Sequence, residues 1–209
     1  MRTPKIATRG SQLAQIQTDF VKKALEKEGI ESEIVVVKTR GDRDLRPISL
    51  IGGDGLFVRE TEKLLLTEEA DIAVHSAKDL PYRLADGLLI GGVLEEGDPR
   101  DCLVIRRQDG GAYGRADIGQ NIGKETEEGH SGKTAGTAVA WLRRASAPLI
   151  GTGSPRRMAE CRRWNPGAQF KSIRGNVGTR LKLLLEGACD AVVLAQAGLD
   201  RLSMDNFVI

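Results

Sequence analysis

The sequence is poor in aromatic residues and histidine, and each shortage excludes a class of protein. Only 4% of its 209 residues are aromatic, which is too few for the stacking platforms that hold single-stranded nucleic acid. A net charge of +2 also argues against a nucleic-acid partner, because such domains are normally strongly basic. The two histidines, His75 and His130, have no cysteine pair at metal-ligand spacing, so we expect no metal site.

Cysteine is also scarce, and long hydrophobic runs are missing. Cys102, Cys161 and Cys189 form no CxxC pair, and an odd, widely spaced set is typical of reduced thiols in a cytoplasmic protein. Residues 1–5 lack the apolar segment of a signal peptide. The longest uncharged stretches, such as 88–94, are far shorter than the roughly 18 residues of a membrane span. We therefore predict a cytoplasmic chain without a membrane partner.

Strand-like and helix-like segments alternate along most of the chain, which predicts an α/β fold with a mostly parallel sheet. The helices are recognised by apolar residues at helical spacing, by caps such as Ser154 before Pro155, and by Gly29 as a stop. The predicted strands cover residues 5–7, 33–38, 72–75, 88–94, 102–105, 149–151, 169–173 and 191–194, and the predicted helices run from 11 to 29, from 57 to 69, from 154 onward, from 176 to about 187 and from about 195.

Residues 108–148 depart from this pattern. They contain eight glycines and no sustained periodicity, so we interpret them as a flexible insertion with one short helix around 137–144. The segment Gly132–Thr134 resembles part of a phosphate-binding P-loop. That motif also needs a glycine five positions earlier, where this chain has Glu127, and a preceding strand.

Three short segments share one local design, in which a strand ends, a turn of small residues follows, and a helix begins. They are Thr8–Ser11, Gly151–Ser154 and Arg174–Asn176. Such turns present backbone N–H groups at the positive end of a helix dipole, which favours bound anions. In open α/β sheets, ligands bind at the carboxyl ends of the strands, where these turns lie. Each turn taken singly is also explained as an ordinary helix cap.

Positive charge is concentrated around two of these turns. Residues 151–180 contain seven basic residues and one acidic residue, of which we expect Arg162 and Arg163 to be solvated surface. The remainder suggest a ligand with several negative groups. Because the chain has neither a Walker motif nor GxGxxG after a strand, several carboxylates fit better than a polyphosphate, and a phosphate or nucleotide binder is the weaker alternative.

The segment Asp71–Pro81 runs from a strand into a turn closed by proline, so Lys78 and Asp79 are expected at the carboxyl end of a strand. A carboxylate among cations stays ionised, and it can stabilise a cationic intermediate or move a proton. A turn aspartate that bonds its own backbone explains the pattern equally well. His75 is expected to pack at the strand end rather than to act as a catalyst.

Six strings along the chain match one known pattern in order. The strings are Ile6–Arg9, His75–Pro81, Asp98–Asp101, Gly151–Arg157, Arg174–Arg180 and Ala197–Leu202. They cover the chain apart from residues 108–148, and the strings at 75–81 and 174–180 are the most specific. Together they resemble the porphobilinogen deaminase (hydroxymethylbilane synthase) family.

This resemblance implies two lobes of periplasmic-binding-protein type with mixed, mostly parallel sheets and a cleft between them. On this basis we expect one lobe at 1–97 plus 198–209 and another at 98–197. The implied activity is the condensation of four porphobilinogen molecules into hydroxymethylbilane with release of ammonia, a step of tetrapyrrole biosynthesis. The implied cofactor is dipyrromethane, which a cysteine of a third, C-terminal domain holds through a thioether.

The resemblance also assigns roles by position. Asp79 corresponds to the catalytic aspartate, which stabilises positive charge on pyrrole nitrogens as ammonia leaves, and Asn176 and Arg201 correspond to further cleft positions. The residues that would bind the carboxylates of cofactor and substrate are Arg9, Ser11, Lys78, Thr152, Ser154, Arg156, Arg157, Arg174 and Arg180.

Several departures from the family pattern affect these expectations. None of the three cysteines lies in the third domain's cysteine motif, so we expect no covalent cofactor on this chain alone, and a separate C-terminal domain is a possible partner. Leu50 and Asp54 replace the usual lysines of a glycine-rich loop, and Gly153 replaces a common serine. The chain is expected to be a monomer. It is interpreted as a fragment, a divergent or decayed copy, or one half of a split enzyme, with a non-catalytic polycarboxylate-binding module as the rival function.

Overall fold

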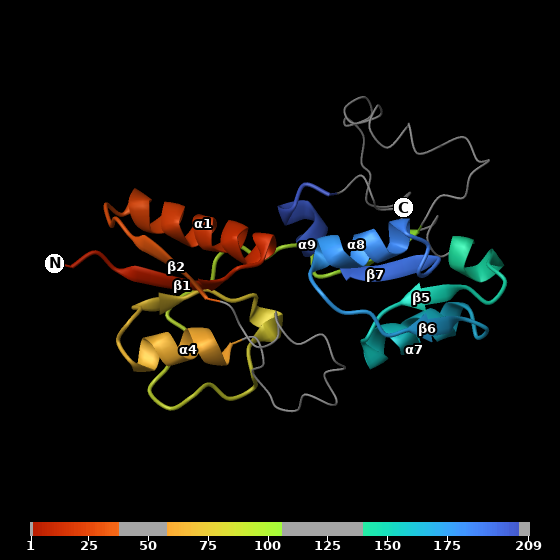
Figure 1. Cartoon of the computed structure of the whole chain (residues 1–209), viewed down its shortest axis with the longest axis horizontal. Coiled ribbons are helices and arrows are strands. Elements are labelled where there is room, and N and C mark those ends of the chain that lie inside the picture. The colour runs from red at the N-terminus through yellow and green to blue at the C-terminus, as the bar shows by residue number, and fades with distance from the viewer. Residues whose placement is uncertain (1, 38–57, 106–139, 205–209) are drawn as a thin grey trace, which may run out of the picture. The chain divides into compact units, whose positions relative to one another are not determined.

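The computed structural model describes residues 2–37, 58–105 and 140–204. The chain divides into two compact units, Met1–Glu96 and Gly97–Ile209, and both are α/β (Figure 1). The predicted α/β class with mostly parallel sheets is confirmed by the strand pairing in each unit. In the part of the chain that the structure describes, no helix has the length and apolar character needed to cross a membrane.

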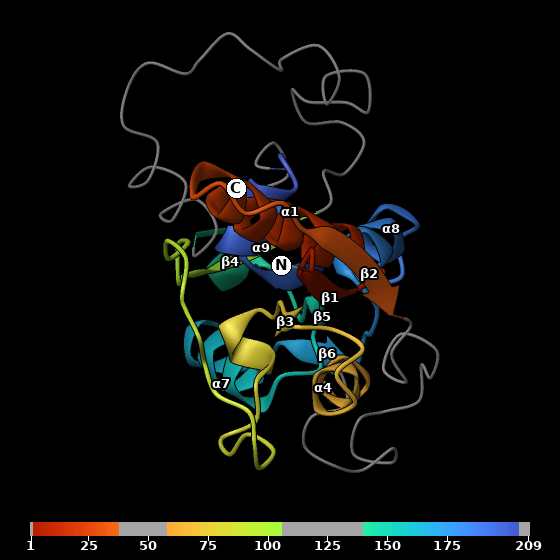
Figure 2. The same ribbon diagram turned by 90° about the vertical axis from the view of Figure 1, so that its left-hand side faces the viewer.

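The first unit contains a three-stranded sheet in the order β2-β1-β3. Strand β1 is fully buried at Ile6, Ala7 and Thr8, because it lies between two parallel neighbours and has a helix on each side, α1 and α4 (Figures 1 and 2). The elements are β1 (Lys5–Arg9), α1 (Gln12–Lys27), β2 (Glu33–Val37), α4 (Arg59–Leu66), β3 (Ile72–Ala73) and the 3-10 helix η1 (Ala77–Asp79).

The second unit contains a four-stranded sheet in the order β4-β7-β5-β6, in which only β4 runs antiparallel to its neighbour. The elements are β4 (Asp101–Ile105), β5 (Leu149–Gly151), α7 (Pro155–Trp164), β6 (Gln169–Lys171), α8 (Val177–Leu185), β7 (Ala191–Ala195) and α9 (Gln196–Arg201).

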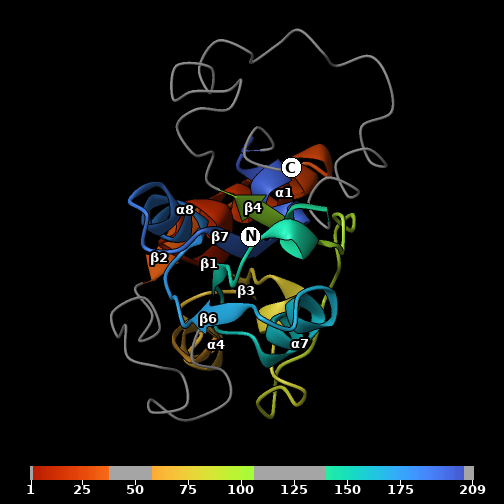
Figure 3. The same cartoon turned by 90° about the vertical axis from the view of Figure 1, so that its right-hand side faces the viewer.

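Alternation along β7 divides the core of this unit into two parts. Val192 and Leu194 pack with Leu181 and Leu184 of α8, whereas Val193 packs with the side that contains α7. Successive side chains of a strand point to opposite faces, so one strand supports both layers, as the positions of α8 and α7 in Figure 3 illustrate. A strand buried on both faces has the continuous apolar run that β7 shows.

Local signals in the sequence located most elements correctly. Ser11, Ser154 and Asn176 are the N-caps of α1, α7 and α8 as predicted. Gly29 follows the end of α1 and has a φ of +74°. Helices commonly end at a residue with this left-handed backbone, which glycine adopts without strain. Most of the predicted insertion lies outside the described residues. Within its described part, residues 140–144 are helical as expected.

The predicted strand at 88–94 is wrong, because the structure has no strand there. Leu89, Ile90 and Val93 are 80%, 60% and 82% exposed, and the described strands pair only with one another. A strand needs a neighbour for its backbone hydrogen bonds, and the glycines at 91 and 92 weaken the extended conformation further.

The observed division of the chain also differs from the expected lobes at the C-terminal side. Residues 198–209 were expected with the first lobe, whereas residues 198–204, the described part of that segment, belong to the second unit. The physical reason is packing, since Leu199 of α9 is fully buried in the cluster that contains Leu194.

Candidate active site

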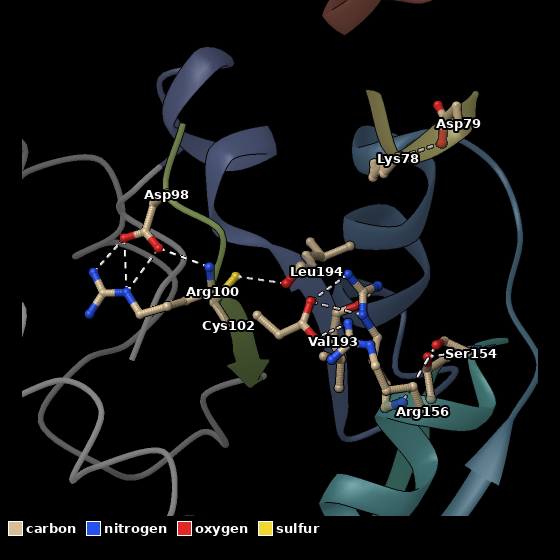
Figure 4. A network of polar contacts seen from close by, with 12 residues as sticks. Lys78, Asp79, Asp98, Arg100, Cys102, Ser154, Arg156, Val193 and Leu194 are labelled. Carbon is tan, nitrogen blue, oxygen red and sulfur yellow. Dashed lines mark hydrogen bonds and ion pairs between the residues drawn. The ribbon is translucent and has the colours of Figure 1, made fainter. Parts of the chain in front are cut away.

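All three strands of the first unit are parallel, so their carboxyl ends share one edge. Strand β1 ends at Arg9, and the chain after β3 passes through η1 to Asp79. The Asp79 Oδ2 atom lies 3.8 Å from Arg9 Nη1, and its Oδ1 atom lies 2.6 Å from Lys78 Nζ (Figure 4). The sheet edge therefore brings together the predicted catalytic aspartate and two of the predicted carboxylate-binding cations.

The Asp79 cluster is partly shielded from water. The side chains of Arg9 and Asp79 are 18% and 24% exposed, whereas Lys78 is 64% exposed. The backbone of the turn is fixed because the Asp79 N–H donates to the Ser76 carbonyl at 2.9 Å. An acid held this way among cations can stabilise developing positive charge nearby.

His75 lies close enough to Asp79 and Arg9 for their charges to act on it, and the hydrogen bonding of Thr61 indicates its tautomer. Its Nε2 atom is 3.2 Å from the Thr61 hydroxyl, which already donates its single hydrogen to the Val58 carbonyl. Neutral His75 therefore donates from Nε2. Burial lowers the pKa of His75, the Asp79 charge partly offsets this, and Arg9 lowers the pKa further. This agrees with its expected role as a packed strand-end histidine.

The first of the three turns predicted to bind anions leads from β1 into α1, where the Ser11 hydroxyl accepts from the Ala14 N–H at 3.3 Å. On the same helix, Gln17 Oε1 accepts a 2.7 Å hydrogen bond from the Ser76 hydroxyl, three residues before Asp79. Sequence reasoning did not select Gln17. Its only sequence signal is that it is a polar side chain within the helix that follows the cap.

The other two turns lie at one edge of the second sheet, because β5 and β6 are parallel and adjacent. A Cβ atom added at Gly153 would lie 3.5 Å from the Ser172 hydroxyl, so the turns after β5 and β6 are in contact range. Thr152 is only 1% exposed, and its hydroxyl accepts from the Ser154 N–H at 3.2 Å. Thr152 therefore stabilises the turn, while Ser154 accepts from the Arg157 N–H at 3.5 Å.

The predicted arginine pair at the start of α7 is held by a carboxylate that sequence reasoning gave no role. Asp101 Oδ2 accepts from Arg156 Nη2 at 2.5 Å, and its Oδ1 accepts from Arg157 Nε and Nη2 at 3.0 and 2.6 Å. Arg157 Nη1 also donates to the Val193 carbonyl at 3.0 Å. The exposed fractions differ accordingly, with Arg156 at 72% and Arg157 at 15%.

The third turn is shaped by Gly175, whose φ of +101° favours glycine. Asn176 Oδ1 accepts from both the N–H and the hydroxyl of Thr179 at 2.9 Å. Arg180 Nε donates to the Gly175 carbonyl at 2.9 Å, so Arg180 supports the turn that carries Arg174.

All three cysteines are buried. The Cys102 thiol donates to the Leu194 carbonyl at 3.4 Å, and burial raises its pKa to about 11. Burial also raises the pKa of Cys161. A thioether anchor needs an accessible thiolate, which none of the three supplies. Within the described ranges, no three His, Cys, Asp or Glu side chains gather where they could bind a metal ion.

The predicted site residues are thus divided between the two units. The first unit contains Arg9, Ser11, Lys78 and Asp79, and the second contains the remaining predicted positions, including Arg201 at the end of α9. Leu50 and Asp54 lie outside the described residues, as do all eight glycines of the predicted insertion.

These features define an α/β protein whose sheet edges carry arginines, capped helix N-termini and the ion-paired aspartate Asp79. Residues 5–208 match a family model described as porphobilinogen deaminase, dipyromethane cofactor binding domain. The chain belongs to the porphobilinogen deaminase family, as its motifs predicted, and the domain that it matches is the one named for the expected cofactor.

The chain is 40% identical over 211 residues to the porphobilinogen deaminase of Syntrophomonas wolfei, covering 100% of this chain and 59% of that relative. It is 39% identical to the enzyme of Syntrophobacter fumaroxidans, covering 99% of this chain and 58% of the relative. It therefore spans less than two thirds of the length of these curated relatives. A solved VFT2 domain of Bordetella pertussis BvgS matches with coverage of 94% of this chain and 67% of that domain's chain, at 16% identity and a TM-score of 0.45.

Proposed function

We propose that this chain contributes the two lobes of a hydroxymethylbilane synthase, which condenses four porphobilinogen molecules into hydroxymethylbilane with release of ammonia. The observation that carries the proposal is the ion-paired cluster of Arg9, Lys78 and Asp79 at a sheet edge, in a chain of the deaminase family. The product serves tetrapyrrole biosynthesis.

The chemistry of the two site groups suits this substrate. Porphobilinogen bears one acetate and one propionate group, so a growing chain of pyrroles accumulates carboxylates. Guanidinium groups bind carboxylates through paired hydrogen bonds, and the N-termini of α7 and α8 add positive dipoles. We assign carboxylate binding to the arginines and the capped turns.

Asp79 has the complementary role. Loss of ammonia from porphobilinogen leaves positive charge spread over a pyrrole ring, and a fixed carboxylate near the ring nitrogen stabilises that charge. Lys78 and Arg9 hold Asp79 in place at 2.6 and 3.8 Å. The aspartate therefore acts during the reaction, whereas its basic neighbours also bind substrate carboxylates.

The residues of this chain fit the carboxylates of the implied dipyrromethane cofactor but not its covalent anchor. The Arg156 side chain is largely exposed, and its positive charge can bind a carboxylate of the cofactor. The three cysteines are buried and are not suited to a thioether. When bound, the cofactor supplies the end of the chain onto which pyrroles are added. We therefore propose that a separate cysteine-bearing C-terminal domain completes the enzyme.

A second candidate is a non-catalytic module that binds polycarboxylates through the same arginines. For either function we propose a monomeric chain in the cytoplasm. Buried free thiols suit that compartment, and the mass in size-exclusion chromatography tests the monomer.

One experiment separates the two functions. The purified chain is incubated with porphobilinogen, alone and with the C-terminal domain of the Syntrophomonas wolfei relative, while ammonia and hydroxymethylbilane are measured. We expect product only from the mixture. Mass spectrometry should find the added dipyrromethane mass on the C-terminal domain and not on this chain. If porphobilinogen binds but the mixture forms no product, the binding module is the correct function.

A further inference from the structure

We propose that Asp101 is a positioning residue that, held by Arg157, orients the Arg156 guanidinium group toward one carboxylate group of the ligand. The inference rests on the proposed function and deepens it. Asp101 lies 55 positions before Arg156, and both of its oxygens are engaged by the arginine pair at 2.5 to 3.0 Å.

The location of Asp101 explains how it can fix the pair. It is the first residue of β4 and lies opposite Ala195 of β7 in an antiparallel register, so its backbone belongs to the sheet. The arginines belong to the first turn of α7, which follows β5. The carboxylate therefore connects the sheet to the start of a helix that carries the predicted ligand contacts.

Electrostatics supplies the reason why a carboxylate is needed there. Two adjacent guanidinium groups repel each other, and the positive end of the α7 dipole adds to this repulsion. A carboxylate that accepts hydrogen bonds from both guanidinium groups replaces this repulsion with attraction. Hydrogen bonds between charged groups are stronger than those between neutral groups. Without Asp101, the guanidinium groups would separate and lose their common orientation.

The two arginines are held to different degrees. Arg157 has three of its nitrogens engaged, two by Asp101 and one by the Val193 carbonyl, and it is 15% exposed. Arg156 has one nitrogen engaged by Asp101 and is 72% exposed. Arg157 thus fixes the carboxylate, and Arg156 presents its outward nitrogens to the ligand from a defined position.

The test is calorimetric binding of porphobilinogen to the purified chain and to Asp101→Asn. We expect about a tenfold weaker affinity in the variant, the loss typical of one charge-assisted hydrogen bond. Asp98→Asn is the matched control, because Asp98 is exposed to the same degree and pairs with Arg100 rather than with the arginine pair. We expect the control to bind within about twofold of the unsubstituted chain.

A positional role is distinguished from a merely structural one by a double-mutant cycle with Arg156→Gln. If Asp101 acts through Arg156, the loss caused by Arg156→Gln shrinks in the Asp101→Asn background. Arg157→Lys supplies a second variant should Asp101→Asn unfold, since it keeps the charge but loses the two-nitrogen contact. It should weaken binding similarly, whereas Arg163→Lys on the exposed side of α7 should not.

The outcomes separate the inference from the proposed function. Unchanged or tighter binding by Asp101→Asn, or an Arg156→Gln loss that is equal in both backgrounds, would overturn the positioning role alone. If the unsubstituted chain does not bind porphobilinogen, the proposed function fails, and the inference that rests on it fails as well.

Discussion

The Asp79 carboxylate lies 3.8 Å from the Arg9 guanidinium, although Arg9 ends β1 and Asp79 ends the 3-10 turn that follows β3. The parallel pairing of β1 with β3 produces this proximity, because it brings both carboxyl ends to one edge of the sheet. A carboxylate and a guanidinium group that are distant in sequence therefore lie together at the sheet edge where α/β proteins bind ligands.

Substitution of Asp79 by Asn should separate chemistry from binding. Asn keeps the size of the side chain but loses the charge that stabilises a cationic ring, so turnover in the completed enzyme should fall by at least about a hundredfold. Porphobilinogen binding should not weaken, because Arg9 and Lys78 remain. Ammonia release and calorimetry measure the two effects, and retained turnover would show that Asp79 is only a turn residue.

Substitution of Arg174 by Leu should weaken porphobilinogen binding by about tenfold or more, the loss expected for a charged hydrogen-bond donor. Arg163→Leu is the control, since Arg163 is an exposed residue of α7 and should leave the affinity within about twofold. Equal affinities for both variants in calorimetry would mean that Arg174 does not contact the ligand.

Substitution of Gly175 by Ala should destabilise the second unit. The φ of +101° strains any residue with a Cβ atom, and the new Cβ would lie 2.7 Å from a Thr179 side-chain atom. We expect a loss of about 1–3 kcal/mol in the free energy of unfolding.

The matched control for that change is Gly153→Ala. Its Cβ would meet the Ser172 hydroxyl at 3.5 Å, an ordinary contact, and surface changes of this kind stay within about 0.5 kcal/mol. Urea unfolding measures both variants, and equal stabilities would contradict the strained turn.

The pH dependence of stability should contain a contribution from His75. Because burial lowers its pKa in the folded state, the unfolded chain binds more protons at pH values between that lowered pKa and about 6.5. The free energy of unfolding should therefore fall as the pH drops below about 6.5. His75→Gln should reduce the difference between urea melts at pH 7.5 and pH 5.5, and an unchanged difference would contradict the buried neutral ring.

Local features of the fold were predictable from the sequence. Ser11, Ser154 and Asn176 were identified as caps because a cap depends on a few adjacent residues, and the structure has each of them in that role. The three strand–turn–helix segments followed from the same local signals.

Features that depend on distant residues were not predictable. The apolar segment 88–94 was typical of a strand, but a strand also needs a neighbour, and its side chains are exposed instead. The role of Asp101 was missed for the same reason. The string Asp98–Asp101 was recognised as a motif. The partners of Asp101, Arg156 and Arg157, belong to another element, so the sequence did not reveal their contact.

The central claim is that the arginines and capped turns of this chain bind the carboxylates of a pyrrole. Calorimetric titration of the purified chain with porphobilinogen and with its dimethyl ester tests it most directly. We predict saturable binding of the acid, weakened by added salt, and at least about tenfold weaker binding of the ester. Equal binding of acid and ester, or no binding of the acid, would contradict the claim.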